Sequence, residues 1–282
     1  MTYKIVVDSC CDLTPERKAD PHFQIVPLTL EIDGRTFIDD DSFDQLEYIR
    51  AVAASKDCAH TACPSPEAYV QAYSGEEDMV FVFTLSEHLS GSYNSAVLAM
   101  NLFYEEYPEL EGRKQIHVFS SDSACCGEAI QAFFCQKLAE QGCSFEEIVE
   151  QTTAYIQDVR TYFVLEDMET LKKNGRLTGL AALLVSALNI RPVMSADHGV
   201  IIKIGQARGL ERALKSMVGH VCDAVKNPEQ KTVSITHVNC PERAESVKNQ
   251  LLARCSFRDV YIVNAAGVST TYANDGGIVV AV

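Results

Sequence analysis

The sequence lacks the long apolar run that a membrane-spanning helix needs. No part of the 282 residues approaches ~18 consecutive apolar residues, and the first residues lead directly into an apolar strand rather than into the core of a signal peptide. We therefore expect a cytoplasmic protein with no integral membrane segment. Positive charge is also scarce, because the chain has 24 Lys and Arg residues but 39 Asp and Glu residues. The resulting net charge of −15 argues against nucleic acid and anionic membrane surfaces as partners.

The spacing that zinc sites and common catalytic motifs require is missing too. The chain has 11 cysteines, but no C-x-x-C pair occurs, and Cys10–Cys11 and Cys125–Cys126 are adjacent pairs. We expect free thiols that pack as small apolar side chains, with no metal or cofactor. There is also no P-loop, no G-x-G-x-x-G after a strand and no G-x-S-x-G elbow. These absences favour a binding protein over an enzyme.

The stretch Met79–Phe103 carries the strongest functional signal. Val80–Thr84 is rich in β-branched and aromatic residues, which predicts a buried strand, and apolar residues recur at helical spacing from Ser92 onward. Ser90, Gly91 and Ser92 stand where the helix should begin. Backbone N–H groups, the helix dipole and two hydroxyls would suit a phosphate or a carboxylate there. Simple capping by one of the serines explains the same residues, so both interpretations stay open.

Small polar residues follow three successive predicted strands in the first half of the chain. They are Asp8-Ser9, Ser86–Ser92 and Ser120–Ser123, and a predicted helix follows each of them. Repeated strand–loop–helix order predicts a parallel sheet flanked by helices, and its ligands bind at the carboxyl ends of the strands. We therefore expect the three loops to meet at one edge. The acidic run Asp39–Asp41 is expected to be a solvated turn.

The second half of the chain has a different pattern. Val193–Ser195 and Val200–Ile204 flank an Asp-His-Gly turn and predict an antiparallel hairpin. Leu180–Ile190 is almost wholly apolar, which predicts a buried helix that belongs either to the core or to the wall of a tunnel. We expect an α/β protein of two domains: residues 1–160 form a parallel sheet flanked by helices, and residues 161–282 form a smaller mixed α/β domain.

Several short motifs occur in a characteristic order along the chain. They are Asp8-Ser9 with Asp12-Leu13, Thr61 with Pro64-Ser65-Pro66, Leu89–Tyr93 with Ser95-Ala96, Leu171 with Gly175-Arg176, Arg191-Pro192 and Arg208-Gly209. Each motif is weak alone, but together they resemble the DegV family of bacterial fatty-acid-binding proteins. The resemblance implies a two-domain α/β protein that buries one long-chain fatty acid, with the carboxylate at the interdomain cleft. It also implies a partner, a separate ATP-dependent fatty acid kinase that makes an acyl phosphate for phospholipid metabolism.

The same resemblance implies roles for individual residues. Thr61 and the corner Ser90-Gly91-Ser92 would contact the carboxylate, and Arg208 would lie on the surface that meets the kinase. The family usually carries a histidine near its C-terminus that also contacts the carboxylate, and here no histidine is present in that segment. Tyr272 falls nearest to its place. A phenol can donate one hydrogen bond but carries no positive charge at neutral pH.

The leading hypothesis is therefore a lipid carrier without catalysis of its own. Each buried methylene contributes ~0.8 kcal/mol, so the acyl tail should dominate affinity while the headgroup contacts set orientation. The alternative is a hydrolase or phosphotransferase that uses the Ser/Thr/Asp rim with His60, His88 or His237 as its base. A regulatory or scaffold protein with a structural lipid is a third possibility. The sequence identifies no catalytic residue and no metal ligand.

Overall fold

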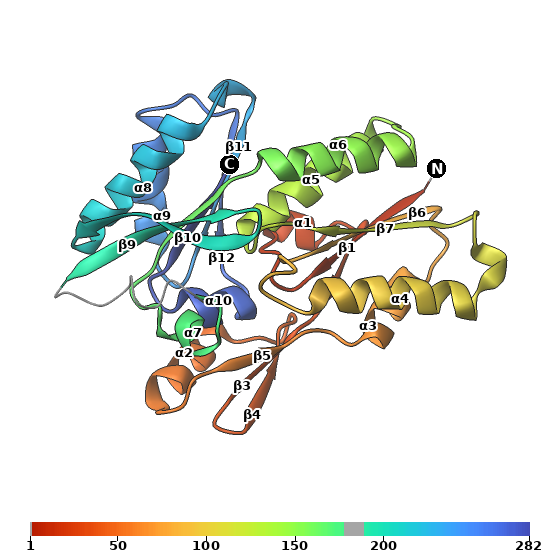
Figure 1. Ribbon diagram of the computed structural model, residues 1–282, viewed down its shortest axis with the longest axis horizontal. Helices are drawn as coiled ribbons and strands as arrows, with labels where there is room; N and C mark the ends of the chain where they lie inside the picture. Colours follow the sequence, from red (N-terminus) through yellow and green to blue (C-terminus); the bar gives the residue numbers. More distant parts are fainter. Residues whose placement is uncertain (1, 178–188) are drawn as a thin grey trace.

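Two large sheets form the framework of the protein (Figure 1). The computed structural model describes residues 2–177 and 189–282. The first sheet is parallel with the order β2-β1-β6-β7, and its strands are Tyr3–Asp8 (β1), Phe23–Val26 (β2), Met79–Thr84 (β6) and Gln115–Ser120 (β7). The second sheet is mixed with the order β10-β9-β8-β13-β11-β12, and its strands are Thr161–Val164 (β8), Ile190–Asp197 (β9), Val200–Arg208 (β10), Thr232–His237 (β11), Asp259–Asn264 (β12) and Ile278–Ala281 (β13). The predicted α/β class, with a parallel sheet first and a mixed sheet second, is confirmed.

Helices cover both sheets, and one of them lies between the two. They are Pro66–Tyr73 (α3), Ser92–Glu106 (α4), Cys126–Glu140 (α5), Phe145–Asp158 (α6), Leu210–Ala224 (α8) and Pro241–Leu252 (α9). The helix α5 contacts β1 and β6 of the parallel sheet and also β11 and β13 of the mixed sheet. The helices α8 and α9 pack on the mixed sheet, and α4 packs on the parallel sheet. The N-terminus of α5 is therefore directed into the region between the sheets.

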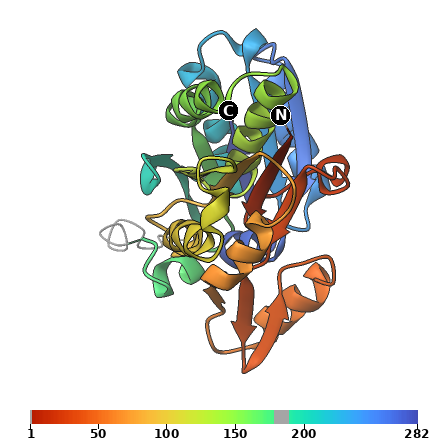
Figure 2. The same cartoon turned by 90° about the vertical axis from the view of Figure 1, so that its right-hand side faces the viewer.

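Short elements complete the chain, and the three-stranded sheet and the helix α2 (Gln45–Ala54) lie below the parallel sheet (Figure 2). A three-stranded antiparallel sheet has the order β4-β3-β5, and the remaining elements are Pro15–Lys18 (α1), Thr29–Ile32 (β3), Arg35–Ile38 (β4), Gln45–Ala54 (α2), His60–Ala62 (β5), Glu169–Lys173 (α7), Gly267–Ala273 (α10) and the 3₁₀ turns Pro108–Leu110 and Pro228–Gln230. The helix α10 belongs to the second half of the sequence but contacts α2 and β3 from the first half. This contact links the two parts of the chain close to Tyr272.

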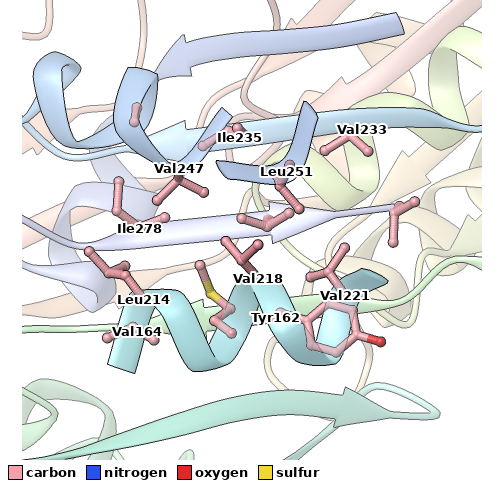
Figure 3. Close-up of a cluster of buried hydrophobic side chains, with 14 of the residues drawn as sticks. Tyr162, Val164, Leu214, Val218, Val221, Val233, Ile235, Val247, Leu251 and Ile278 are labelled. Atoms are coloured by element: carbon pink, nitrogen blue, oxygen red, sulfur yellow. The ribbon is translucent and has the colours of Figure 1, made fainter. Parts of the chain in front are cut away.

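The helix α8 shows why the apolar pattern of the second half produces a packed layer (Figure 3). Its fully or almost fully buried residues Leu214, Met217, Val218 and Val221 recur at intervals of three and four, which places them on one face. That face packs on Tyr162, Val164, Ile278 and other apolar residues of the mixed sheet and of α9. The core of this half therefore lies between the mixed sheet and its outer helices.

Four expectations from the sequence have different outcomes. The hairpin is confirmed, and its strands extend over Ile190–Asp197 and Val200–Arg208. The expected solvated turn is wrong for Asp39, which is 4 % exposed, while Asp40 and Asp41 are exposed. Most of the predicted helix at residues 180–190 lies outside the described residues, and Ile190 begins β9. The division into domains at residue 160 stays a prediction.

Glu128 is a buried acid in the layer between the sheets. It lies on α5 with no exposed surface, and neither of its carboxylate oxygens has a hydrogen-bond partner in the described part of the chain. Burial, followed by the charge of Asp8, raises the pKa of Glu128 well above its ordinary value of 4.5. Glu128 therefore keeps its proton in the folded protein at a pH at which the unfolded chain has lost it.

We expect the substitution Glu128→Gln to stabilise the protein increasingly as the pH rises. Below pH 4.5 both states of Glu128 are protonated and the variant should match the parent chain. Between pH 4.5 and the pKa of Glu128 in the folded protein, the free energy of unfolding of the parent chain falls by about 1.4 kcal/mol per pH unit. It falls because only the unfolded state releases a proton. Urea unfolding at pH 5, 6.5 and 8 measures this trend. The exposed Glu140→Gln on the same helix is the control, and equal stability changes at all three pH values would contradict the explanation.

None of the helices in the described part of the chain combines the length and the apolar character that crossing a membrane requires.

Candidate functional site

The three loops that follow β1, β6 and β7 meet at the carboxyl edge of the parallel sheet, as predicted. Leu85 N donates a hydrogen bond of 3.0 Å to Asp8 Oδ2, which joins the end of β1 to the end of β6. Ser86 N donates one of 2.8 Å to the backbone oxygen of Ser123, which joins the end of β6 to the loop after β7. Adjacent parallel strands bring their carboxyl ends together, so this edge follows from the order of the strands.

An apolar cavity of about 100 Å³ lies between this edge and the mixed sheet. Its walls come from all three loops, from β8, from the β9–β10 hairpin and from α10. The lining residues include Cys10, Leu85, Leu89, Ala124, Cys125, Phe163, Leu165, Leu171, Ala196, Ile201, Val268 and Val279. An engineered apolar cavity of about 150 Å³ takes up benzene, so the size and lining of this cavity suit a small apolar group. A longer apolar ligand would require the surrounding side chains to move apart.

Arg176 supplies a positive charge at the wall of this apolar cavity. Its Nε donates a hydrogen bond of 3.1 Å to the backbone oxygen of Leu89, and its guanidinium lies 5.4 Å from the centre of the Tyr272 ring. A second hydrogen bond, of 2.7 Å, reaches the backbone oxygen of Asn174. Within residues 2–177 and 189–282 Arg176 pairs with no carboxylate. A half-buried cation without an anionic partner favours a negatively charged ligand.

Thr61 and Tyr272 are brought together from opposite ends of the chain. Thr61 lies on β5, Tyr272 lies on α10, and their hydroxyl oxygens are 2.9 Å apart. Tyr272 also lines the cavity beside Arg176. The two predicted headgroup contacts are therefore neighbours, and the Arg176 guanidinium lies next to them. That they contact a carboxylate stays a prediction.

Buried aspartates hold α10, and with it Tyr272, in place. Asp39 accepts hydrogen bonds of 2.6 Å from Gly267 N and 2.9 Å from Val268 N, at the start of α10. Asp12 accepts one of 2.8 Å from the backbone of the residue that precedes the helix. Burial raises the pKa of Asp39 and outweighs the two backbone hydrogen bonds that lower it. Because Asp39 satisfies N–H groups that the helix itself cannot pair, it fixes the start of α10.

The corner Ser90-Gly91-Ser92 lies beside these residues but does not line the cavity. Ser90 Oγ accepts a hydrogen bond of 3.2 Å from Ser92 N, but the N-cap residue of α4 is Gly91 and no side chain makes a capping hydrogen bond, so the expectation that Ser90 or Ser92 caps the helix is wrong. A Cβ atom on Gly91 would lie 3.2 Å from Cys63 Sγ, which places the corner against the loop after β5. Leu89, one residue before the corner, is the nearest wall of the cavity. The corner's contact with a headgroup stays a prediction.

Arg208 and the three candidate histidines lie elsewhere. Arg208 ends β10 and is exposed, and no ion pair to it occurs among the described residues. His60 Nδ1 is 2.8 Å from Asn174 Oδ1, and His237 Nδ1 accepts a hydrogen bond of 3.2 Å from Cys240 N. His88 is exposed. In the described residues none of the three histidines hydrogen-bonds Ser90 or Thr61, so no nucleophile–base pair forms there.

One group of side chains in the described part of the chain carries atoms that could hold a metal ion. Asp8, Cys10 and Glu128 are buried, and one oxygen or sulfur atom from each lies within 4.8 Å of the others. Burial raises the pKa of Asp8 to about 7. The pKa values of Cys10 and Glu128 are raised well above their ordinary values, for Cys10 by the neighbouring Cys125 and by burial. Protons therefore compete with any cation for this group.

Sequence reasoning missed the roles of Arg176 and Asp39. Arg176 was recognised only as part of a motif, and its position beside Tyr272 depends on a contact across 96 residues of chain. Asp39 stands in an acidic run that is typical of a solvated turn, and its partner Gly267 is 228 residues away. The one local signal was the unusual turn Gly175-Arg176, which places a cation directly after a short charged helix.

Comparisons with known proteins identify the family of this chain. A family model described as "Uncharacterised protein, DegV family" matches residues 2–282. A DegV domain-containing protein of Streptococcus pyogenes serotype M18 is 36 % identical, over 99 % of this chain and 98 % of the relative. The crystal structure of a DegV family protein from Ruminococcus gnavus with vaccenic acid is 47 % identical with a TM-score of 0.96, and each chain is covered completely. The Streptococcus pneumoniae fatty acid kinase (Fak) B3 protein, loaded with linoleic acid, is 31 % identical with a TM-score of 0.90, over 100 % of this chain and 99 % of the other. The chain therefore belongs to the DegV family.

Proposed function

We propose that this protein binds one long-chain fatty acid and presents it to a separate fatty acid kinase. The observation that carries the proposal is Arg176, a cation without an anionic partner in the described part of the chain, at the wall of an apolar cavity. A fatty acid has the matching chemistry, a single negative charge at the end of an apolar chain. Three DegV relatives support this choice, since they were solved with vaccenic acid, heptadecanoic acid and linoleic acid.

The carboxylate would be held by one charged and several neutral donors. Arg176 would supply a positive charge, while the hydroxyls of Thr61 and Tyr272 would donate hydrogen bonds. The corner Ser90-Gly91-Ser92 follows Leu89, which lines the cavity, and it would add backbone and hydroxyl donors to the headgroup. Hydrogen bonds to a charged group contribute about 1.5–3 kcal/mol each. The negative net charge of the protein opposes an anion, so these local donors must overcome it.

The acyl chain would extend from this headgroup site into the cavity. Burial of each methylene contributes ~0.8 kcal/mol of favourable binding free energy. This gain would offset the free energy that is needed to move the cavity walls apart. The loops after β6 and β7 and the β9–β10 hairpin form these walls, and they belong to different parts of the fold. Binding of the tail would therefore open the cavity by moving these segments apart.

Native mass spectrometry tests this function directly. The purified protein, first delipidated and then mixed with oleate or palmitate, should gain the mass of one fatty acid per chain. The variant Ala196→Phe, which fills the cavity, should lose this uptake. The control Ala253→Phe lies on the exposed residue after α9 and should retain it. Protein that remains free of lipid after exposure to either acid would contradict the proposal.

Arg208 provides a test of the kinase step that leaves lipid binding intact. We expect Arg208→Glu to lower acyl phosphate formation by a purified bacterial fatty acid kinase and ATP at least tenfold, because charge reversal opposes docking at this exposed position. Fatty acid affinity should not change, because Arg208 does not line the cavity. Equal rates of acyl phosphate formation with the parent and the variant would remove Arg208 from the kinase-binding surface.

A further inference from the structure

Two thiols lie in the wall of the cavity. Cys10 follows β1, Cys125 precedes α5, and both line the cavity with exposures of only 2 % and 8 %. Ser269 Oγ links the two residues, because it lies within hydrogen-bond distance of Cys125 Sγ, at 3.2 Å, and of the backbone oxygen of Cys10, at 3.5 Å. The two thiols therefore lie on either side of one serine, at the wall of the space assigned to the acyl chain.

Cys125 is the more reactive sulfur of the pair. Its backbone has φ +57° and ψ −131°, a region that residues with a Cβ atom rarely adopt and that occurs preferentially at functional sites. It also stands at the N-terminus of the 15-residue helix α5, where the helix dipole stabilises a thiolate. The pKa of Cys125 is raised above its ordinary value by burial, but less far than the pKa of Cys10. Cys10, in contrast, keeps its proton, because the neighbouring Cys125 and burial raise its pKa well above the ordinary value.

The surroundings protect this dithiol from oxidants in bulk water. Although the neighbouring Cys10 lowers the pKa of Cys125, burial and the charge of Asp12 raise it above its ordinary value, so the thiolate fraction is low and reaction with a dilute oxidant is slow. An oxidant that binds in the cavity meets the sulfur at a high effective concentration. The oxidant with the right shape and polarity for this cavity is a fatty acid that itself carries a hydroperoxide.

We propose that Cys10 and Cys125 reduce a fatty acid hydroperoxide bound in the cavity and form a disulfide. This inference rests on the proposed function, because lipid binding delivers the peroxide. Cys125 sulfur attacks the terminal peroxide oxygen, the O–O bond breaks, and the fatty acid leaves as a hydroxy acid after taking up the thiol proton. Cys10 sulfur then attacks the resulting sulfenic acid and releases water. In total, one hydroperoxide and two thiols give one hydroxy acid, one disulfide and one water, with two electrons passing from sulfur to oxygen.

The chain contains a matched control pair outside the cavity. Cys222 on α8 and Cys255 after α9 are near enough for Cys255 to raise the pKa of Cys222, but both are only half-buried and neither lines the cavity. This pair is open to oxidants dissolved in water. Comparing the oxidation of the two pairs shows whether the peroxide reacts from the cavity or from solution. A peroxide bound in the cavity should oxidise Cys10 and Cys125, whereas a peroxide in solution should oxidise Cys222 and Cys255.

The experiment mixes the reduced, delipidated protein with one equivalent of linoleic acid hydroperoxide. Free thiols are then alkylated, disulfides are mapped by mass spectrometry, and the hydroxy acid is quantified by liquid chromatography. Native mass spectrometry with unoxidised linoleate runs in parallel. The variants are Cys125→Ser, Cys10→Ser and the control Cys222→Ser, each checked by circular dichroism for an unchanged fold. Because Cys11 and Cys126 are adjacent to the reacting residues in sequence, these serine variants also assign the disulfide.

The expected result is a Cys10–Cys125 disulfide and one hydroxy acid per chain, with the Cys222–Cys255 pair still reduced. Cys125→Ser should lose hydroxy acid formation at least tenfold. Cys10→Ser should still form it but leave a sulfenic acid that dimedone traps, and Cys222→Ser should behave as the parent. Oxidation of Cys222–Cys255 to the same or a greater extent than Cys10–Cys125 would overturn the inference. Linoleate binding without thiol oxidation would overturn this inference alone, whereas failure to bind linoleate would overturn the proposed function.

Discussion

Substitution of Arg176 by glutamine is expected to weaken long-chain fatty acid binding by roughly 10- to 100-fold, since a hydrogen bond to a charged group contributes about 1.5–3 kcal/mol. Arg176 lines the cavity and pairs with no carboxylate among the described residues. Glutamine retains much of the side-chain length and can still donate to the backbone of Leu89, but it removes the charge. Isothermal titration with oleate measures the loss.

Two variants control for effects other than charge. Arg176→Lys retains a positive charge without the planar guanidinium and should lose less affinity than the glutamine variant. Arg208→Gln removes an arginine at an exposed position outside the cavity and should bind oleate as the parent does. If Arg176→Gln binds oleate with unchanged affinity while Arg208→Gln weakens it, the headgroup lies at another site.

Substitution of Asp39 by alanine is expected to lower the free energy of unfolding by about 2–4 kcal/mol, because it leaves two backbone N–H groups buried without a partner. These groups belong to Gly267 and Val268 at the start of α10. Since α10 carries Tyr272, the same substitution should also weaken oleate binding by about three- to tenfold through loss of one ordinary hydrogen bond. Urea unfolding and titration calorimetry measure the two effects.

The neighbouring acid gives a matched control for this variant. Asp41 is exposed, and Asp41→Ala should change the free energy of unfolding by no more than about 0.5 kcal/mol. The two substitutions remove the same side chain two residues apart, so their difference isolates the contact with α10. Equal small effects of Asp39→Ala and Asp41→Ala would show that the start of α10 does not depend on this carboxylate.

Elements with a strong local pattern could be predicted from the sequence. The strand–loop–helix around Ser90 was correct because a fully buried strand, a loop of small residues and a helical apolar repeat follow each other without interruption. The meeting of the three strand-end loops followed from the geometry of parallel sheets. The hairpin β9–β10 was correct because its turn residues are diagnostic.

Contacts between distant parts of the chain could not be predicted in this way. Asp39 was expected in water because nothing near it in sequence indicates a partner, and its partners lie at the start of α10. Thr61 and Tyr272 were both selected through a family resemblance, but their hydrogen bond spans 211 residues and required the fold. The sequence does not show that Arg176 lies at an apolar cavity, because the walls of this cavity come from the loops of the parallel sheet and from the mixed sheet. Tertiary packing, rather than local propensity, decides each of these cases.

The most direct test of the account compares oleate with oleyl alcohol, which has the same chain but no charge. Titration of the parent protein should give clearly tighter binding of the acid, by at least tenfold, since the alcohol cannot form the charged contact with Arg176. The variant Arg176→Gln should bind the two ligands with nearly equal affinity. A preference for the acid that is equally large in the parent and in Arg176→Gln would contradict the claim that Arg176 holds the carboxylate at the wall of this cavity.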